Sequence, residues 1–136
     1  MKQLTIFILF FVVIIFPMAC KKNSQNNNNS ALLIGKWNNI STYKSDGTHL
    51  RSWTGGQYLS LRQDGTFDEY GNIFDFASSS ASSAHGGTYT ITDDSLYLTS
   101  SNGRNYNFKV QTLTNSSLVL RKKYNTDFDV LWDYSK

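Results

Sequence analysis

The sequence predicts an all-β fold, a small antiparallel up-and-down β-barrel of about eight strands. Past Ile34, apolar side chains alternate with polar ones, as Leu59 and Leu61 do with Tyr58 and Ser60. Such a period of two is typical of half-buried strands. Turn-forming pairs separate the alternating runs, and no window has the periodicity of a useful helix. Because the runs follow one another as hairpins, a meander is the simplest topology.

The breaks between the runs have the composition of tight turns. Asp64-Gly65 and Asn102-Gly103 each separate two alternating runs, and such pairs supply the positive φ values of a type I′ hairpin turn. Asp93-Asp94 and Asn115-Ser116 close two further turns. Residues 77–87 are rich in serine, alanine and glycine, which predicts a mobile loop at one mouth of the barrel.

The N-terminal segment has the features of an export signal. Residues 4–16 are almost wholly apolar and Lys2 precedes them. This run is shorter than the roughly 20 residues that a membrane-spanning helix needs, and a short apolar segment behind a basic start is typical of a signal peptide. A permanent N-terminal anchor helix is the alternative. The polar stretch at residues 21–23 favours cleavage, so we expect a signal peptide over residues 1–19.

Cys20 is the only cysteine of the chain, so it cannot form a disulfide within it. It lies between the apolar segment and a polar stretch, where a buried structural thiol is not expected. Residues 16–20, Phe-Pro-Met-Ala-Cys, resemble a bacterial lipobox. That resemblance implies cleavage after Ala19 and acylation of Cys20, which would anchor the protein in a membrane. Stable anchoring needs more than one acyl chain, and a lipoprotein cysteine carries three.

The residues after Cys20 predict a tether and then one domain. Residues 21–30 contain only Lys, Asn, Ser and Gln, which bury too little apolar surface to fold, so residues 20–31 form an acylated cysteine with a flexible spacer. Residues 32–136 have the size of one small domain. Lys21 stands where lipoprotein sorting patterns place an inner-membrane retention aspartate, and no acidic cluster follows. By resemblance to those patterns, we expect an outer-membrane lipoprotein that faces the periplasm.

An ordered set of segments resembles a known family. Gly35-Lys36-Trp37 is followed by the segments 58–67, 86–100 and 116–123, and together they are similar to the small lipocalin-like lipoproteins of Bacteroidetes. This resemblance implies a meander barrel, often with an unassigned ligand. In lipocalins the Gly-x-Trp tryptophan closes one end of the barrel and a late arginine packs across its ring. The matching positions are Trp37 and Arg121, which we expect to form this barrel-closing pair.

The sequence offers little catalytic or metal-binding chemistry. It has two histidines, His49 and His85, without the spaced cluster of a metal site, and we expect both in solvated loops. No Gly-x-Ser-x-Gly motif occurs. Asp68 and Glu69 are adjacent, so they face opposite ways on a strand. The chain has 13 Lys and Arg against 10 Asp and Glu, a balance that does not point to nucleic acid. We therefore expect no enzyme, no metal and no cofactor.

Four aromatic side chains near loops are candidates for a ligand-binding mouth. Aromatic residues at a barrel mouth can line a pocket for an apolar or sugar ligand. The alternative is that they cap the core. The candidates are Trp53, Tyr58, Phe74 and Phe76. Separately, Asp94-Ser95-Leu96 resembles the O-glycosylation pattern of exported Bacteroidetes proteins, although it also suits a turn.

Three functions remain open. The first is an envelope-tethered lipocalin-like domain that binds a small apolar or amphipathic molecule. The alternative is a packed β-barrel interaction module, an inhibitor or envelope assembly partner, with no internal ligand. A hydrolase is a third. The barrel interior distinguishes them, since a binding domain needs an aromatic-lined pocket and an interaction module needs an exposed apolar patch.

Overall fold

The structure is a computed structural model, and it describes residues 30–52, 56–71, 73–74 and 84–136. One helical turn at residues 30–33 precedes the strands. The strands of this part of the chain are β1 (Gly35–Lys44), β2 (His49–Ser52), β3 (Tyr58–Leu61), β4 (Thr66–Tyr70), β5 (Ala84–Thr92), β6 (Ser95–Ser100), β7 (Asn105–Leu113), β8 (Ser117–Lys123) and β9 (Asp129–Ser135).

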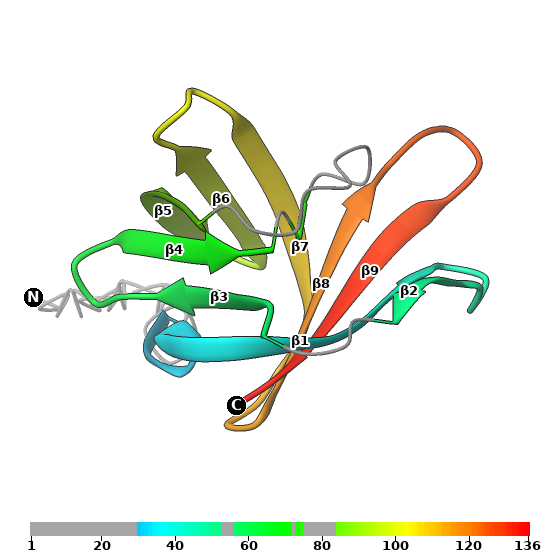
Figure 1. Cartoon of the computed structure of the whole chain (residues 1–136), viewed down its shortest axis with the longest axis horizontal. Helices are drawn as coiled ribbons and strands as arrows, with labels where there is room; N and C mark the ends of the chain where they lie inside the picture. The colour runs from blue at the N-terminus through cyan, green and yellow to red at the C-terminus, as the bar shows by residue number, and fades with distance from the viewer. Residues whose placement is uncertain (1–29, 53–55, 72, 75–83) are drawn as a thin grey trace, which may run out of the picture.

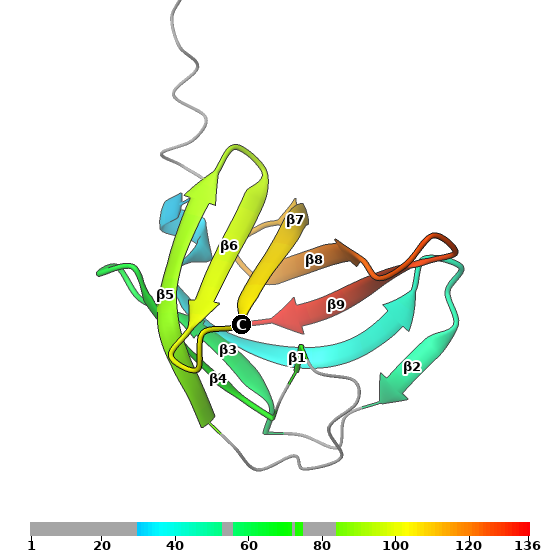
Figure 2. The same cartoon turned by 90° about the horizontal axis from the view of Figure 1, so that it is seen from above.

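The strands form one antiparallel sheet that closes into a barrel (Figure 1). Strands β3 to β9 pair in chain order, and β1 pairs with β3 along its first half and with β9 along its second half. Closure of β1 on β9 gives an eight-stranded antiparallel barrel, so the predicted fold class is confirmed. Strand β2 pairs with the far end of β1 and extends the sheet beyond the barrel (Figure 2).

A bulge in β1 changes which of its residues face inward. The register with β9 slips between Asn39 and Ser41, and Ile40, at the slip, is exposed. A bulge places two residues of one strand opposite one residue of its partner. As a result Trp37, Asn39 and Thr42 are all buried, although strict alternation from Trp37 would place Ser41 inside.

The hairpin turns occur where the sequence predicts them, with a different geometry. Gly65 has φ 80° and Gly103 has φ 82°, while neither Asp64 nor Asn102 has a positive φ. The Gly65 amide donates to the Arg62 carbonyl at 3.2 Å. A type I′ turn requires positive φ at both central residues, whereas a three-residue loop needs it only at the last. The expected type I′ geometry is therefore wrong, and the glycine alone adopts the left-handed conformation.

Strand β5 begins inside the segment expected to be a loop. Residues 84–87 pair with β4, from Tyr70 opposite Ala84 to Phe67 opposite Gly87. A Cβ atom on Gly87 would collide with the Thr99 carbonyl and lie 2.8 Å from Phe67 Cε1. Glycine therefore permits the close approach of β4, β5 and β6 at this point. The expected loop is wrong for residues 84–87, and residues 77–83 lie outside the described part.

Inward-facing side chains fill the barrel. The alternating residues of β3, β4, β6 and β8 place one buried side chain at every second position. The fully buried hydrophobic residues with the largest side chains are Trp37, Trp132, Tyr134, Phe67, Phe108, Leu33, Leu59, Leu61, Ile73, Leu96, Leu98 and Leu118. Almost all of them belong to the barrel wall; Leu33 lies in the helical turn, and Ile73 lies in the connection between β4 and β5.

Candidate binding site inside the barrel

Ile73 and Phe74, here called the plug, enter the barrel from the connection between β4 and β5. The Phe74 ring centroid lies 4.6 Å from that of Phe108, 5.3 Å from that of Tyr106 and 6.0 Å from that of Trp132. Only 8% of Phe74 is exposed. Tyr106, Phe108 and Trp132 come from β7 and β9 and form an aromatic seat for the Phe74 ring.

Two side chains hold the backbone of the plug. The Ile73 amide donates to Glu69 Oε2 at 3.2 Å, and the Trp132 indole Nε1 donates to the Ile73 carbonyl at 3.0 Å. Glu69 belongs to β4 and Trp132 to β9. Buried backbone groups need such partners, and here side chains of the barrel wall supply both. The plug is thus fastened at two points without being part of the sheet.

A row of buried polar side chains crosses the inner wall from β9 over β1 to the residue just before β3. Tyr134 of β9 is opposite Asn39 of β1. The backbone amide of Asn39 donates to the backbone carbonyl of Gln57, just before β3, at 3.0 Å. Tyr134, Asn39 and Gln57 are 0%, 8% and 7% exposed. We call these three residues the polar row.

Each member of the polar row has one buried atom without a hydrogen bond among the described residues: the Tyr134 hydroxyl, Asn39 Oδ1 and Gln57 Oε1. The orientation of the Asn39 side-chain carboxamide is set because its Nδ2 donates to the Asp133 backbone carbonyl at 3.3 Å. Burying such a group without a partner costs about 1–3 kcal/mol. Three of them in one row need a physical reason.

Two neighbours define the surroundings of the polar row. Burial, and then the charge of Glu69, raise the pKa of Tyr134 well above its usual value, and the polar side chain of Asn39 beside the hydroxyl lowers it by less, so the hydroxyl is neutral. Gly71 has φ +102°, and a Cβ there would collide with the Gln57 side chain, whose Cδ would be 2.9 Å away. Gly71 therefore leaves the space in which Gln57 lies.

Two lysines flank Val130 near the start of β9. Val130 pairs with Lys44 of β1 and with Lys122 of β8, so the three share one face of the sheet. The Lys122 ammonium lies 5.5 Å from the Tyr106 ring centroid, and that of Lys44 lies 4.6 Å from the Phe128 ring centroid. This end of the barrel thus combines the aromatic seat with two cations.

The expected barrel-closing tryptophan lies in the core with a different cation over its ring. Trp37 is fully buried, and its Nε1 donates to the Leu33 carbonyl at 2.7 Å. The Lys136 ammonium lies 4.2 Å from the Trp37 ring centroid and donates to the carbonyls of Leu32 and Ile34 at 2.9 and 3.0 Å. Sequence reasoning missed Lys136, because only the closure of β1 on β9 brings the C-terminus to Trp37.

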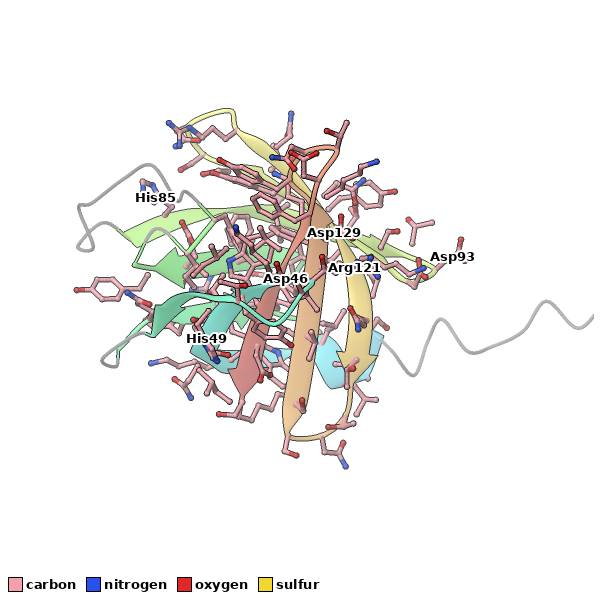
Figure 3. The ribbon with its side chains drawn as sticks, turned by 90° about the vertical axis from the view of Figure 1, so that its right-hand side faces the viewer. Asp46, His49, His85, Asp93, Arg121 and Asp129 are labelled. Carbon is pink, nitrogen blue, oxygen red and sulfur yellow. The ribbon has the colours of Figure 1, made fainter. Side chains whose placement is uncertain are left out.

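Arg121 does not take the predicted position over Trp37. It is exposed because it directly follows the buried Leu120 on β8 and faces outward. Its Nε donates to Asp129 Oδ2 at 2.6 Å, and Figure 3 shows the two residues side by side. The expected Trp37–Arg121 contact is therefore replaced by Trp37–Lys136 and Arg121–Asp129.

The candidate mouth residues do not gather in one place. Phe74 is in the interior, whereas Tyr58 lies on the outer face, where its ring stacks on Tyr70 at 5.9 Å and Lys36 lies 4.1 Å from its centroid. Tyr58 faces outward because it stands between the buried Gln57 and Leu59. Trp53, Phe76 and Cys20 lie outside the described residues.

The histidines occupy strands in place of the expected loops. His49 begins β2 and is exposed, and His85, in β5, is half-buried opposite Glu69 of β4; Figure 3 shows them well apart. Within the described ranges no group of three or more histidine, cysteine or acidic side chains could hold a metal ion. In the same part of the chain, no helix has the length and apolar character of a membrane span.

Two depressions are lined by none of the aromatic-seat residues. One, of about 300 Å³, is lined by Ser45, Lys123 and residues 125–129. The other, of about 390 Å³, lies over the β6–β8 surface and is lined by Ser95, Asn107, Lys109, Arg121, Lys122 and Lys123. Two of its cations are engaged in ion pairs, Lys109 with Asp94 at 3.0 Å and Arg121 with Asp129.

Comparisons with known proteins agree with this architecture. A family model described as a lipocalin-like domain matches residues 33–120. A lipocalin-like protein of Bacteroides uniformis superimposes with a TM-score of 0.57 and 18% identity over 77% of this chain and 98% of its own. An uncharacterized protein of Bacteroides eggerthii gives 0.56 and 17% over 76% and 98%. The search of curated proteins finds no match. At these identities the solved structures show a common fold.

Proposed function

The chain belongs to the lipocalin-like domain family, and from that premise we propose that it is an envelope-tethered domain that binds a small apolar or amphipathic molecule inside its barrel. An eight-stranded barrel is just wide enough for side chains or one small ligand. The ligand would occupy the aromatic seat of Tyr106, Phe108 and Trp132, where Phe74 lies in this structure.

The observation that supports this proposal most strongly is the element from which the Phe74 ring comes. Phe74 is not part of the barrel wall, yet its ring fills the space between β7 and β9 in the interior. The wall alone therefore leaves room for an aromatic group beside its own aromatic side chains. Phe74 takes part in no strand pairing, so its displacement would leave the strand ladder intact. A ligand could then replace Phe74 without loss of any strand pairing.

The tether is the second part of the proposal. The lipobox-like residues 16–20 and the polar stretch after them support acylation of Cys20, and the absence of an acid after Cys20 supports an outer-membrane position that faces the periplasm. A spacer of about ten residues reaches roughly 30 Å when extended. The barrel would then stay near the inner leaflet of that membrane, where it could meet amphipathic molecules crossing the periplasm.

Binding of a neutral apolar dye, N-phenyl-1-naphthylamine, tests the proposal. All strand pairings of the described residues lie between Gly35 and Ser135, so a chain starting at Lys21 carries the whole described barrel without the acylated cysteine. Phe74→Ala should bind the dye about tenfold more tightly than the natural chain, with one dye per chain, because the competing ring is gone. Tyr58→Ala, on the outer face, is the matched control and should leave the affinity unchanged.

A filled interior favours the alternative of a packed interaction module. With the plug in place, only 8% of Phe74 is exposed, because the aromatic seat covers it. If the plug never yields, Phe74→Ala should lower stability and gain no saturable dye binding. That result would contradict the binding proposal and leave the outer surface as the part of the molecule that makes functional contacts.

A further inference from the structure

We infer that the polar row of Tyr134, Asn39 and Gln57 recognises the head group of the ligand, and that this head group is a hydrogen-bond donor, a hydroxyl or an ammonium. The inference rests on the proposed function and names the chemical class of the ligand. Its basis is the three buried atoms without a hydrogen bond among the described residues, which lie on β9, on β1 and just before β3.

The chemistry of the row selects a donor. Asn39 Oδ1 and Gln57 Oε1 are acceptors only, and the Tyr134 hydroxyl can both donate and accept. Glu69 is buried on the same inner wall, and its charge acts on Tyr134. An anionic head group would face two carbonyl oxygens and a carboxylate, so the row disfavours it. A hydroxyl or an ammonium would satisfy the acceptors.

The polar row and the aromatic seat form one continuous site. Tyr134 and Trp132 are inward-facing and two residues apart on β9, which separates them by about 7 Å. Ile73 lies between Trp132 of the seat and Glu69, whose charge acts on Tyr134, because its carbonyl accepts from Trp132 and its amide donates to Glu69. Withdrawal of the plug would open the seat for an apolar chain and the row for a polar head.

The two ends of the barrel favour ligand head groups of different chemistry. Lys44 and Lys122 flank Val130, which is four residues before Tyr134 on β9. Anionic groups are favoured at these lysines, and donor groups are favoured at the polar row. A single-chain amphipath with a donor head would therefore enter head first, with its chain against the aromatic seat.

Three amphipaths with the same 12-carbon chain test the inference by displacing the dye: dodecan-1-ol, dodecylamine and dodecanoate. The alcohol and the amine should displace it from the Lys21–Lys136 chain at concentrations at least about tenfold lower than dodecanoate. Tyr134→Phe and Gln57→Met each keep the size of the side chain and remove one atom of the row. Both should bring the three amphipaths to within about threefold of one another while dye affinity is kept.

Tyr97→Phe is the control, because it removes a hydroxyl from an exposed side chain of β6 and leaves both the aromatic seat and the polar row intact. The unfolding midpoint of Tyr134→Phe separates ligand recognition from folding, since the hydroxyl that it removes accepts and donates no hydrogen bond in the described structure, and the midpoint should not fall. A preference for dodecanoate, or a preference for the alcohol and amine that survives both substitutions, would overturn the inference and leave an ordered water as the occupant. Failure of any dye binding would instead overturn the proposed function.

Discussion

The Lys136 ammonium lies 4.2 Å from the ring centroid of Trp37, at the point where the C-terminus of the barrel meets its first strand. Lys136 also donates to the carbonyls of Leu32 and Ile34, and Trp37 donates to that of Leu33. The last residue and the first inward-facing residue of the barrel thus hold the same helical turn. This contact joins the two terminal segments of the barrel to the helical turn.

Trp37→Ala should lower the free energy of unfolding by about 3–5 kcal/mol, as expected for a large buried aromatic side chain. Lys136→Ala should cost less, about 0.5–2 kcal/mol. Because the two side chains touch, their effects should not add in the double variant. Urea denaturation of the single and double variants gives this coupling.

Arg121→Ala is the matched control for Lys136→Ala. Arg121 forms a partly exposed ion pair with Asp129, which is worth about 0.2–1 kcal/mol, and its effect should add to that of Trp37→Ala. Coupling of Trp37 to Arg121 in place of Lys136 would contradict the packing described for this end of the barrel.

Gly87→Ala should destabilise the barrel much more than Gly86→Ala. A Cβ at Gly87 would collide with the Thr99 carbonyl, whereas at Gly86 it would lie 3.1 Å from Asp68 Oδ1 and 3.3 Å from the Phe67 carbonyl. Overpacking of this kind costs about 1–3 kcal/mol or more. Thermal unfolding of the two variants measures the difference. Equal midpoints would show that β5 does not approach β6 as closely as the structure places it.

The raised pKa of Tyr134 predicts that the folded protein loses stability in alkaline solution. Its pKa is raised in the folded state, first by burial and then by the charge of Glu69. The stability that the neutral Tyr134 hydroxyl gives the folded protein is fully present below about pH 10, the pKa of a tyrosine in the unfolded chain. This stability is lost as the pH rises toward the higher pKa of Tyr134 in the folded protein. The pKa values of Tyr43 and Tyr89 are also raised by burial, so the difference between the natural chain and Tyr134→Phe isolates this residue.

Tyr134→Phe should therefore lose less stability between about pH 9 and 11 than the natural chain. Urea denaturation at several pH values gives the two slopes. Identical slopes would mean that the Tyr134 hydroxyl is not buried in the folded protein.

Cys20 should carry fatty acyl chains in the mature protein. A fatty-acid analogue supplied to growing cells should label the natural protein and leave Cys20→Ser unlabelled, because no other cysteine is available. Ser24→Ala, in the same polar stretch, should label like the natural protein. Equal labelling of natural and Cys20→Ser protein would remove the basis for an envelope tether.

Alternation and turn composition were sufficient to predict the barrel. The same alternation places Tyr58 outside, since Leu59 and Leu61 are inside, and it places Arg121 outside next to Leu120. Alternation alone therefore predicts both positions correctly. The nearby loops led to the incorrect placement of Tyr58 at a mouth, and the family resemblance led to that of Arg121 over Trp37.

Other features depend on contacts that the sequence pattern does not carry. The bulge at Ile40 resets the inward positions of β1, so Asn39 and Thr42 are both buried. The polar row requires the register of β9 against β1 and the close approach of Gln57. The position of Phe74 depends on the path of a connection, and connections have no periodicity from which to predict it.

We propose that the plug yields its place to a ligand, and the indole N–H resonances of Trp132 and Trp37 are the sharpest test of this claim. The Trp132 N–H donates to Ile73 of the plug, and the Trp37 N–H donates to Leu33 in the helical turn. Saturation with N-phenyl-1-naphthylamine should shift the Trp132 resonance and speed its hydrogen exchange, while Trp37 stays protected and unshifted. Saturable binding that leaves the shift and exchange of Trp132 unchanged would show that the plug stays in place, and would contradict the claim.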